Sequence, residues 1–394
     1  MDDDIHHSKK NLETALRRVK PLRHGDRAIE FLQHLQASGL SPVRVLKYAT
    51  TMTRILDSID VDTAGRKEIE AFVLELNREN YKAWTKHGYK MTVKKLFQYL
   101  RYGNVSRDTP FPPEVAWIKT RVTEVEMEKE SRISSDVLLG DEEIVSILRA
   151  ARNSRDEAML SVLFESAFRP GELLSLKVGS VQFLQDYCVA SARGKTGQKR
   201  MPLIVSHKAL LRWMSEHPLR SRPEAPLWCA LDTGHVGHGL TYQHFRKIVR
   251  DTAARAGVTK SIWPYLFRHS QLTRMADKLT ESKLTLFGGW RMGTKMTARY
   301  VHWSGRDLEP SLLSIYGLAA PQGQAESSVV FQTVDCPRCN ARNNPASPRC
   351  ESCGFILDKK LALETEDDIA KRIANVEELV RGALSGGTAA PGSR

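Results

Sequence analysis

Four cysteines near the C-terminus have the spacing of metal ligands. They form two CxxC pairs with ten residues between the pairs, and they are Cys336, Cys339, Cys350 and Cys353. Two such pairs place four thiolates where a tetrahedral Zn²⁺ can collect them, a pattern that redox dithiols or chance explain less well. Because cysteine fills all four positions, no ligand position stays open for catalysis. We therefore expect one structural Zn²⁺ in a zinc ribbon whose partner is either DNA or protein.

Basic residues at helical spacing indicate a surface for polyanions. They are Arg78, Lys82, Lys86, Lys90, Lys94 and Lys95, with Tyr81, Trp84 and Tyr89 between them. On a continuous helix the lysines four residues apart would form one stripe with almost no acidic partners. Phosphates would neutralise such a stripe, so we predict contacts with the DNA backbone that carry no sequence code. The alternative is a solvated helix face.

The composition of the whole chain agrees with a polyanionic partner. The 394 residues include 59 Lys+Arg and 46 Asp+Glu, which gives a net charge of +13, and nucleic acid is the commonest partner of basic proteins. With 41% hydrophobic residues the chain can bury a core, which excludes wholesale disorder. The sequence lacks an apolar run of about 18 residues and an apolar signal-peptide core. We therefore expect a cytoplasmic, nucleoid-associated protein with no membrane partner.

Four further stretches are weak signals singly and gain meaning from their order. They are Glu165–Leu176, Arg193–Gly197, Tyr265–Ser270 and Gly289–His302. In this order the chain resembles the tyrosine recombinase (phage integrase) superfamily, whose signature reads Arg, Lys, His-x-x-Arg, His or Trp, and Tyr. The resemblance covers about residues 26–318. In the appended cysteines and in the sequence of the last stretch, the chain looks more like archaeal integrases than bacterial ones.

The resemblance implies that a tyrosine cleaves and rejoins DNA. Tyr300 would attack a phosphodiester to form a 3′-phosphotyrosine and free a 5′-hydroxyl, and a 5′-hydroxyl from a partner strand would reverse the reaction. Arg169 and Arg268 would clamp the non-bridging oxygens of the transition state, because guanidinium groups stay charged and bind bidentately. Lys195, at a predicted turn between strands, would protonate the leaving oxygen. The resemblance implies neither a catalytic metal nor a nucleotide.

Two positions leave the general base open. Tyr265 stands where the family has its first His, and Trp290 takes the position of His or Trp, so neither imidazole of the common set is present. Both side chains can donate a hydrogen bond, but neither is a good base at neutral pH. Deprotonation of Tyr300 then depends on nearby cations or on another histidine. The supporting candidates are Glu172, which can orient Arg169 or pair with a neighbouring helix, and His269 and His302, each a base or a structural histidine.

The hydrophobic periodicity divides the chain into segments that must position these residues. We predict a mainly α-helical protein with one small antiparallel sheet, whose strands lie near 181–183, 187–190 and 201–205. The resemblance implies a helical, SAM-like core-binding domain and a catalytic domain that form a C-shaped clamp around DNA. The segments are a flexible arm (1–24), the core-binding domain (25–103), a linker (104–135), the catalytic domain (136–318), a linker (319–333), the zinc ribbon (334–357), a helix (358–384) and a disordered tail (385–394).

The last helix has apolar residues at spacings of four and three, which is a heptad-like seam. They are Ile369, Ile373, Val376, Val380 and Ala383. Such a helix packs either on its own domain or on a neighbouring protomer. The resemblance gives the second arrangement a use, because the family acts as a homo-tetramer on two DNA duplexes. We expect a monomer when the protein is free of DNA.

The resemblance favours a site-specific recombinase that integrates and excises a mobile genetic element. Alternatives within the same chemistry are Xer-like resolution of chromosome or plasmid dimers and a type IB topoisomerase, which needs no tetramer. From another class, a clamp-type DNA-binding protein without catalysis is favoured only by the substitution at Tyr265. A zinc-ribbon adaptor would leave the arginines, the lysine and the tyrosine unexplained. We therefore predict an enzyme.

Overall fold

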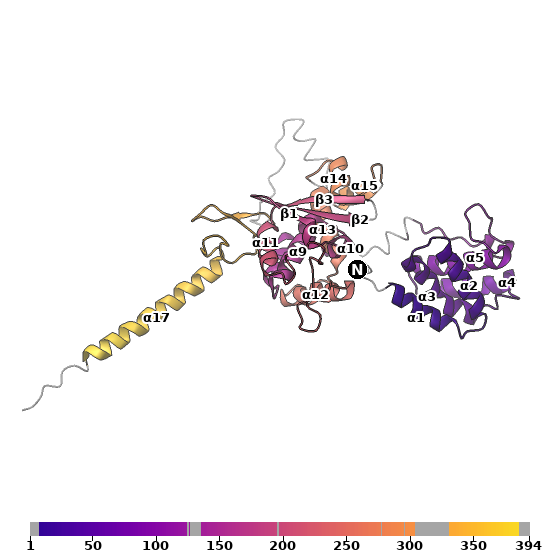
Figure 1. Cartoon of the computed structure of the whole chain (residues 1–394), viewed down its shortest axis with the longest axis horizontal. Coiled ribbons are helices and arrows are strands. Elements are labelled where there is room, and N and C mark those ends of the chain that lie inside the picture. The colour runs from indigo at the N-terminus through magenta and orange to yellow at the C-terminus, as the bar shows by residue number, and fades with distance from the viewer. Residues whose placement is uncertain are drawn as a thin grey trace, which may run out of the picture. The chain divides into compact units, whose positions relative to one another are not determined.

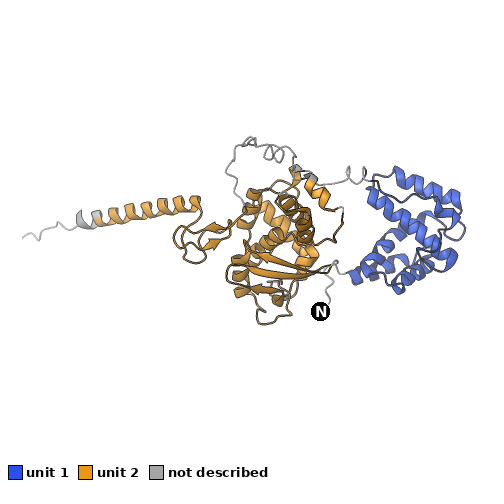
Figure 2. Ribbon diagram, turned by 90° about the horizontal axis from the view of Figure 1, so that it is seen from above, with its two compact units in different colours: residues 1–134 blue, residues 135–394 orange. Residues whose placement is uncertain are grey.

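The structure, a computed structural model, describes residues 8–123, 126, 135–194, 197–276, 278–294, 296–303 and 331–385. The chain divides into two compact units, Met1–Ser134 and Ser135–Arg394 (Figures 1 and 2). Both units are mainly helical, and the sheets of the described ranges lie in the second. None of the helices in these ranges is long and apolar enough to cross a membrane.

Helices alone build the described part of the first unit. They are α1 (Ser8–Val19), α2 (Gly25–Ala37), α3 (Pro42–Ser58), α4 (Arg66–Arg78), α5 (Ala83–Tyr102) and the single-turn α6 (Pro113–Ala116). After α2 the chain turns through Gly39, whose φ is +84°, and Pro42 opens α3 behind the N-cap Ser41. Proline suits a first turn because its missing N–H would have no partner there. The predicted break between these two helices is confirmed.

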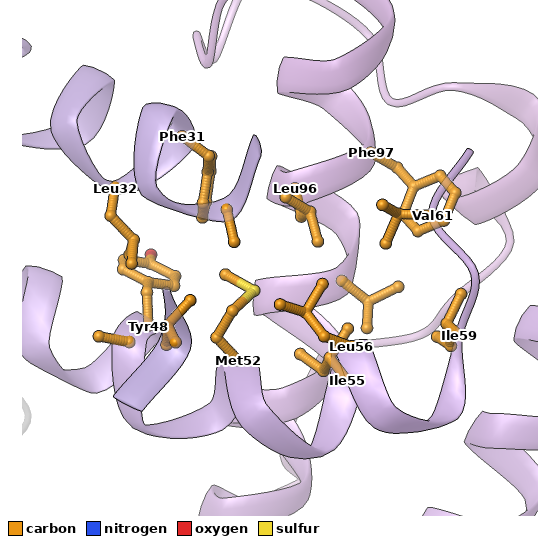
Figure 3. Packing of buried hydrophobic residues seen from close by; sticks show 14 of the residues in the cluster. Phe31, Leu32, Tyr48, Met52, Ile55, Leu56, Ile59, Val61, Leu96 and Phe97 are labelled. Carbon is orange, nitrogen blue, oxygen red and sulfur yellow. The ribbon is translucent and has the colours of Figure 1, made fainter. Parts of the chain in front are cut away.

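The core of the first unit lies where the apolar faces of α2, α3 and α5 meet (Figure 3). On α3 the buried residues recur at spacings of three and four, so one face of the helix points inward. Figure 3 labels Phe31, Leu32, Tyr48, Met52, Ile55, Leu56, Ile59, Val61, Leu96 and Phe97. This core fixes the basic helix α5 within its unit.

We expected a flexible arm over residues 1–24, but the described part of this segment is largely helical. Residues Ser8–Val19 form α1, and the helix buries Leu12 and Val19 in the core of the first unit. The buried positions follow the helical period, but lysines and arginines surround them in the sequence and lower its mean hydropathy. A reading of composition therefore misses this amphipathic helix. Residues 1–7 lie outside the described part of the chain.

The linker expected over residues 104–135 also differs from the structure in its first half. Val115 of α6 is fully buried and Ile118 is 3% exposed, and both belong to the core of the first unit. The proline-rich stretch before them predicts a linker, because proline and short polar residues are typical of loops. Residues 127–134 lie outside the described ranges.

The second unit packs helices around a three-stranded antiparallel sheet. Its helices are α8 (Asp141–Arg149), α9 (Ser154–Ser166), α10 (Pro170–Leu174), α11 (His207–Glu216), α12 (Tyr242–Arg255), α13 (Pro264–Ala276), α14 (Glu281–Gly288), α15 (Met296–Trp303) and α17 (Lys359–Ser385), with 3-10 turns η1 (Ser135–Val137) and η2 (Val178–Ser180). The strands β1 (Val181–Phe183), β2 (Cys188–Gly194) and β3 (Gly197–Leu203) lie in that order across the sheet. The predicted fold class, mainly helical with a small antiparallel sheet, is confirmed.

Strands β2 and β3 form a hairpin that is longer than the predicted strands. Its register pairs Ala192 with Lys199 and Gly194 with Gly197. A Cβ atom at Gly194 would lie 2.5 Å from Oε1 of Glu172, so glycine allows the hairpin to pass close to α10. Residues 195–196 lie outside the described residues, and the predicted general acid Lys195 is one of them.

A second, two-stranded sheet lies in the C-terminal part of the second unit. β4 (Val334–Asp335) pairs antiparallel with β5 (Arg342–Asn343), and the four cysteines lie around this hairpin. The helix α17 follows, and its bounds lie within one residue of those predicted, 358–384. Residues 304–330 and 386–394, which contain most of the second predicted linker and the predicted tail, lie outside the described ranges.

Candidate active site

Helix α13 presents three candidate residues on one side. Tyr265, Arg268 and His269 lie in its first two turns, and positions three and four apart share one face of a helix. Arg268 is 3% exposed, whereas Tyr265, at the start of the helix, is 39% exposed. The same face thus reaches from the solvent into the interior of the unit.

Two backbone carbonyls hold the guanidinium of Arg268. It donates to the carbonyl of Ala167 and, at 2.6 Å, to the carbonyl of Gly288. Ala167 follows α9 with a φ of +48°, a left-handed conformation that costs a residue with a Cβ atom about 1 kcal/mol. Burial, and to a smaller extent Arg169, lowers the pKa of Arg268 to about 10, so the group is still charged at neutral pH.

Arg169, which precedes α10, contacts the same turn. Its guanidinium lies 2.6 Å from a carboxylate oxygen of Glu172 and 3.4 Å from the carbonyl of Gly289. The second oxygen of Glu172 accepts the backbone N–H of Arg169 at 2.9 Å. Of the two roles expected for Glu172, the contacts correspond to orienting Arg169. Because Gly288 and Gly289 are adjacent, both guanidiniums meet one turn of the chain.

Tyr300 of α15 lies within this group and is 1% exposed. Its hydroxyl is 2.8 Å from Nδ1 of His269. Its ring stacks on Trp290 with 5.3 Å between the ring centroids, and on His269 with 5.9 Å. The guanidinium carbon of Arg268 lies 5.5 Å from the centroid of the Trp290 ring. The indole therefore contacts both the tyrosine and the buried arginine.

The protonation of His269 and Tyr300 follows from their burial. Burial, and to a smaller extent Arg268, lowers the pKa of His269 to about 4, so its imidazole is neutral at neutral pH. A ring nitrogen without a proton can accept a hydrogen bond from a phenol. Burial raises the pKa of Tyr300, and Arg268 and Arg299 act in the opposite direction. The pair therefore rests as a neutral imidazole beside a neutral phenol.

Lys199 of β3 belongs to this site although the sequence reading did not single it out. It is 8% exposed, donates to the carbonyl of Ser166 at 2.9 Å and lies 4.8 Å from the centroid of the Phe168 ring. Burial lowers the pKa of Lys199 to about 7, and the two arginines of the site act in the same direction. Lys199 is thus a third basic group of the site beside the two arginines, and its own protonation state changes near neutral pH.

Most of the predicted catalytic and supporting residues are brought together. They are Arg169, Glu172, Arg268, His269, Trp290 and Tyr300. Tyr265 stands at the rim, where its ring centroid is 6.2 Å from that of His269. Lys195 and the side chain of His302 lie outside what the structure describes. Two guanidiniums beside a phenol that is paired with an imidazole can hold an anionic group and supply a nucleophile to it.

The basic stripe predicted for the first unit is divided by the fold. Arg78 ends α4 and Lys82 is the N-cap of α5, so these residues do not share one continuous helix. Lys95 lies on the opposite side of α5 from Lys86, because nine residues make about two and a half turns. Lys82, Lys86, Lys90 and Lys94 follow one another along α5 as predicted, whereas Arg78 and Lys95 do not join their stripe. Arg78 and Lys82 are exposed, and Lys86, Lys90 and Lys95 are partly exposed.

Lys94, for which we predicted a contact with a DNA phosphate, has a structural role. It is 7% exposed and donates to the carbonyls of Ala116 and Ile118 at 3.2 and 3.1 Å. Its ammonium also lies 4.3 Å from the centroid of the Phe111 ring. Lys94 therefore ties the segment after α5 to the core, and the predicted contact of Lys94 with DNA is wrong.

We expect Lys94→Ala to lower the free energy of unfolding of the first unit by about 2 kcal/mol, because two buried carbonyls lose their donor. The substitution should leave the salt dependence of DNA binding unchanged. Lys82→Ala, on the exposed surface, should instead reduce the slope of log K against log salt by about 0.9. Urea denaturation and binding titrations at several salt concentrations measure both effects. Equal loss of slope in the two variants would contradict the structural role of Lys94.

The four cysteine sulfurs form a second candidate site. The Sγ atoms of Cys336 and Cys353 lie 3.6 Å apart, as do those of Cys339 and Cys350, and all four lie within 4.8 Å of one another. A tetrahedral Zn²⁺ with Zn–S bonds of about 2.3 Å separates its sulfurs by about 3.8 Å. Gly354, with a φ of +74°, makes the tight turn predicted after the second pair. The donor set and its geometry therefore fit such an ion.

The cysteine module, residues 331–358, packs on the helices of the second unit. Asn344 is 1% exposed and donates to the hydroxyl of Ser161 on α9 at 3.2 Å. The ring of Phe331 meets that of Phe164 edge to face with 4.9 Å between centroids. These buried contacts make the module part of the second unit, which the sequence reading, with its linker before a separate ribbon, did not predict.

Comparison with known proteins shows which proteins the second unit is similar to. Residues 138–306 match the model of the Phage integrase family. A tyrosine recombinase of Synechocystis sp. is 32% identical over 123 residues, which are 31% of this chain and 39% of that protein. The chain thus matches well under half the length of that curated relative.

Two solved structures share the fold. One is XerH site-specific recombinase bound to a palindromic difH substrate, with a TM-score of 0.55 and 16% identity over 80% of this chain and 98% of that one. The other is a lambda integrase tetramer bound to a Holliday junction, with a TM-score of 0.53 and 14% identity over 72% of this chain and 78% of that one. The fold is therefore that of the tyrosine recombinases. Together with the family match, it supports the assignment of residues 138–306 to the phage integrase family.

Proposed function

We propose that this protein is a site-specific tyrosine recombinase that cleaves and rejoins DNA through a 3′-phosphotyrosine intermediate. The observation that carries the proposal is the hydrogen bond between the Tyr300 hydroxyl and His269, beside the guanidiniums of Arg169 and Arg268. It joins an acceptor for the phenol proton to two charged groups that can hold a phosphate. The family match and the name of the cyanobacterial relative support the same activity.

In the cleavage step, the phenol oxygen of Tyr300 bonds to phosphorus as the bond from phosphorus to the 5′-oxygen breaks. His269 takes the phenol proton, and Arg169 and Arg268 bind the non-bridging oxygens on which negative charge grows. The leaving 5′-oxygen takes a proton from a cation, for which Lys195 is the predicted donor. Rejoining runs these steps in reverse with a 5′-hydroxyl of another strand. The phosphotyrosine conserves the bond energy, so the proposal needs no nucleotide and no catalytic metal.

The other residues of the site support these four groups. Trp290 holds Tyr300 and the buried arginine in place through its ring contacts. Tyr265, which is exposed at the rim, is suited to donate a hydrogen bond to a DNA phosphate. Lys199 has a pKa of about 7 in the free protein. A bound phosphate raises the pKa of a neighbouring amine, so the arrival of DNA would add a third positive charge to the site.

The partner that we propose is a double-stranded recombination site, bound by both units of several copies. The net charge of +13 and the exposed residues Arg78 and Lys82 support backbone contacts in the first unit. The likeness to a lambda integrase tetramer on a Holliday junction supports a tetramer on two duplexes.

The biological role that we propose is integration and excision of a mobile genetic element. The cysteine module favours this role over dimer resolution, because minimal dimer resolvases do without such an addition. Resolution of chromosome dimers is the second candidate, and the likeness of the fold to XerH on its difH substrate favours it. An archaeal source, suggested by the appended cysteines, stays a prediction.

We also propose that the four cysteines bind one structural Zn²⁺. The ion would fix the two CxxC turns and thereby the buried contacts of Asn344 and Phe331 with α9. Its chemistry is limited to holding four thiolates, because they fill a tetrahedral coordination shell. The module then acts by stabilising the second unit.

Removal of the metal should destabilise the second unit. We expect a strong chelator to lower its Tm by about 5 °C, which corresponds to about 2 kcal/mol for a unit of this size, because the module no longer covers α9. Cys353→Ser should do the same and should release zinc in elemental analysis. Cys188→Ser, a buried cysteine outside the cluster, should retain one zinc per chain. An unchanged Tm after complete removal of zinc would contradict a stabilising role.

Trapping of a covalent adduct tests the proposed activity. The full chain is incubated with nicked duplexes that carry sequences flanking its gene, in the presence of EDTA and without a nucleotide. An SDS-resistant complex in which DNA is joined to protein, with a free 5′-hydroxyl on the released strand, is the expected result. Tight binding without any adduct on any of these duplexes would instead support the non-catalytic clamp.

A further inference from the structure

The C-terminal helix α17 carries an apolar seam on its surface. Ile369, Ile373, Val376 and Val380 are 49%, 54%, 57% and 52% exposed. Their spacings of four, three and four residues make them consecutive d, a, d and a positions of a heptad repeat. Four β-branched apolar side chains in one line, each about half exposed, are unusual on a helix surface. They are the pattern of a helix that buries one face against a partner helix.

Two charged residues flank this seam on opposite sides. In the same heptad register Arg372 occupies a g position and Glu377 the following e position. Both line one surface hollow together with Ile369, Ile373 and Val376, so they border the apolar seam directly. In coiled coils, residues at g and e face the partner helix across the edge of the apolar seam and select its identity and direction.

These charges fit a second copy of the same helix. In a parallel pair, a g residue faces the e residue that lies five positions later in the partner. Arg372 would therefore meet Glu377 of the second copy, and the symmetry of the pair would repeat this contact on the other side. An antiparallel pair with full overlap would face Arg372 with Leu379 and Glu377 with Ala370, and it would gain neither contact.

We propose that α17 is a self-association helix that pairs in parallel with α17 of a second copy of this chain. The seam covers about two heptads, which is short for a coiled coil, so the association is weak and reversible. β-branched residues at both a and d positions shift the preference from two parallel helices to three or four, so further copies can join the pair in the same direction. The pairing thus sets the direction of assembly, and the concentration sets its extent.

This pairing would give the recombinase a contact between copies that does not involve the active site. If the proposed function holds, DNA brings several copies to neighbouring positions, and a weak contact then acts at a high effective concentration. The association itself does not depend on that function, because it requires only α17 and can be measured without DNA.

Sedimentation equilibrium of the full, zinc-loaded chain without DNA tests the proposal. We expect reversible self-association, which Ile373→Asp should weaken by about tenfold or more by placing a charge in the seam. Arg372→Glu and Glu377→Arg should each weaken it, because like charges then face each other. The double variant Arg372→Glu/Glu377→Arg, and an equimolar mixture of the two single variants, should recover it.

Glu378→Arg is the matched control, because it makes the same charge change at an outward f position and should leave the association unchanged. A mass that corresponds to the monomer at all concentrations would overturn the proposal and would support the monomer expected from the sequence. Association that survives Ile373→Asp, or charge variants that fail to restore one another, would also overturn it. None of these outcomes bears on DNA cleavage, so the two proposals fail separately.

Discussion

Arg268→Met is expected to lower the rate of DNA cleavage by about a thousandfold, because the lost guanidinium would otherwise stabilise the charge that grows on the phosphate oxygens. The carbonyls of Ala167 and Gly288 hold this guanidinium in place before DNA arrives. The side chain therefore loses little conformational entropy when the phosphate binds. Single-turnover cleavage of a nicked duplex measures the rate. Binding of the same duplex should change by less than about tenfold, since most phosphate contacts lie elsewhere.

The control for this prediction is Arg274→Met on the same helix. Arg274 pairs with Asp141 at 3.2 Å and is not one of the arginines that donate to the turn at Gly288 and Gly289. Its loss should lower the thermal stability of the second unit and leave the cleavage rate of the folded protein within about threefold, because it lies outside the proposed site. If Arg268→Met cleaves as fast as Arg274→Met when both are folded, Arg268 does not act on the transition state.

His269→Gln is expected to lower cleavage at neutral pH by about a hundredfold or more, because the amide cannot take the proton of Tyr300. The pH profile separates this loss from a general structural defect. The pKa of His269 is lowered to about 4, so the imidazole of the wild type is already unprotonated at pH 6. Above that pH its rate should depend little on the ionisation of His269. In His269→Gln the phenol must ionise unaided, so the rate should rise about tenfold per pH unit.

Chemical rescue provides the matching test of the base. His269→Ala leaves a space beside the Tyr300 hydroxyl, and added imidazole should restore part of the cleavage rate. If the pH profile of His269→Gln is parallel to that of the wild type, and imidazole does not rescue His269→Ala, then His269 has the structural role that the sequence also allowed. Deprotonation of Tyr300 would then depend on the electrostatic effect of the nearby cations or on His302.

The members of the candidate site could be predicted from the sequence because their order along the chain follows a known pattern. The contacts between these residues could not be predicted from the sequence. Nothing in the spacing indicates that Arg268 and Arg169 meet adjacent carbonyls, because those contacts depend on how the turn at Gly288 and Gly289 folds. The hydrogen bond from Tyr300 to His269 is equally a product of packing between α15 and α13.

For Lys199, the sequence contains a signal that predicts its burial. In β3, Lys199, Met201 and Leu203 alternate with exposed residues, so the period of a strand places the lysine on the buried face. The predicted strand begins at Met201, four residues after the start of β3, and therefore leaves Lys199 in a turn. Lys94 is the opposite case, because its spacing suggested an exposed stripe while the carbonyls that bury it come from a segment more than twenty residues away.

The central claim is that Tyr300 is the nucleophile, and mapping the covalent adduct tests it most directly. The wild type and Tyr300→Phe are incubated with the same nicked duplex, and the DNA is trimmed to a nucleotide before digestion with trypsin. Cleavage after Arg299 and Arg306 gives a peptide of residues 300–306. We predict that the added mass lies on Tyr300 in this peptide and that Tyr300→Phe forms no adduct. An adduct of undiminished yield in Tyr300→Phe, or mass added to Tyr265 or Tyr316, would contradict the account.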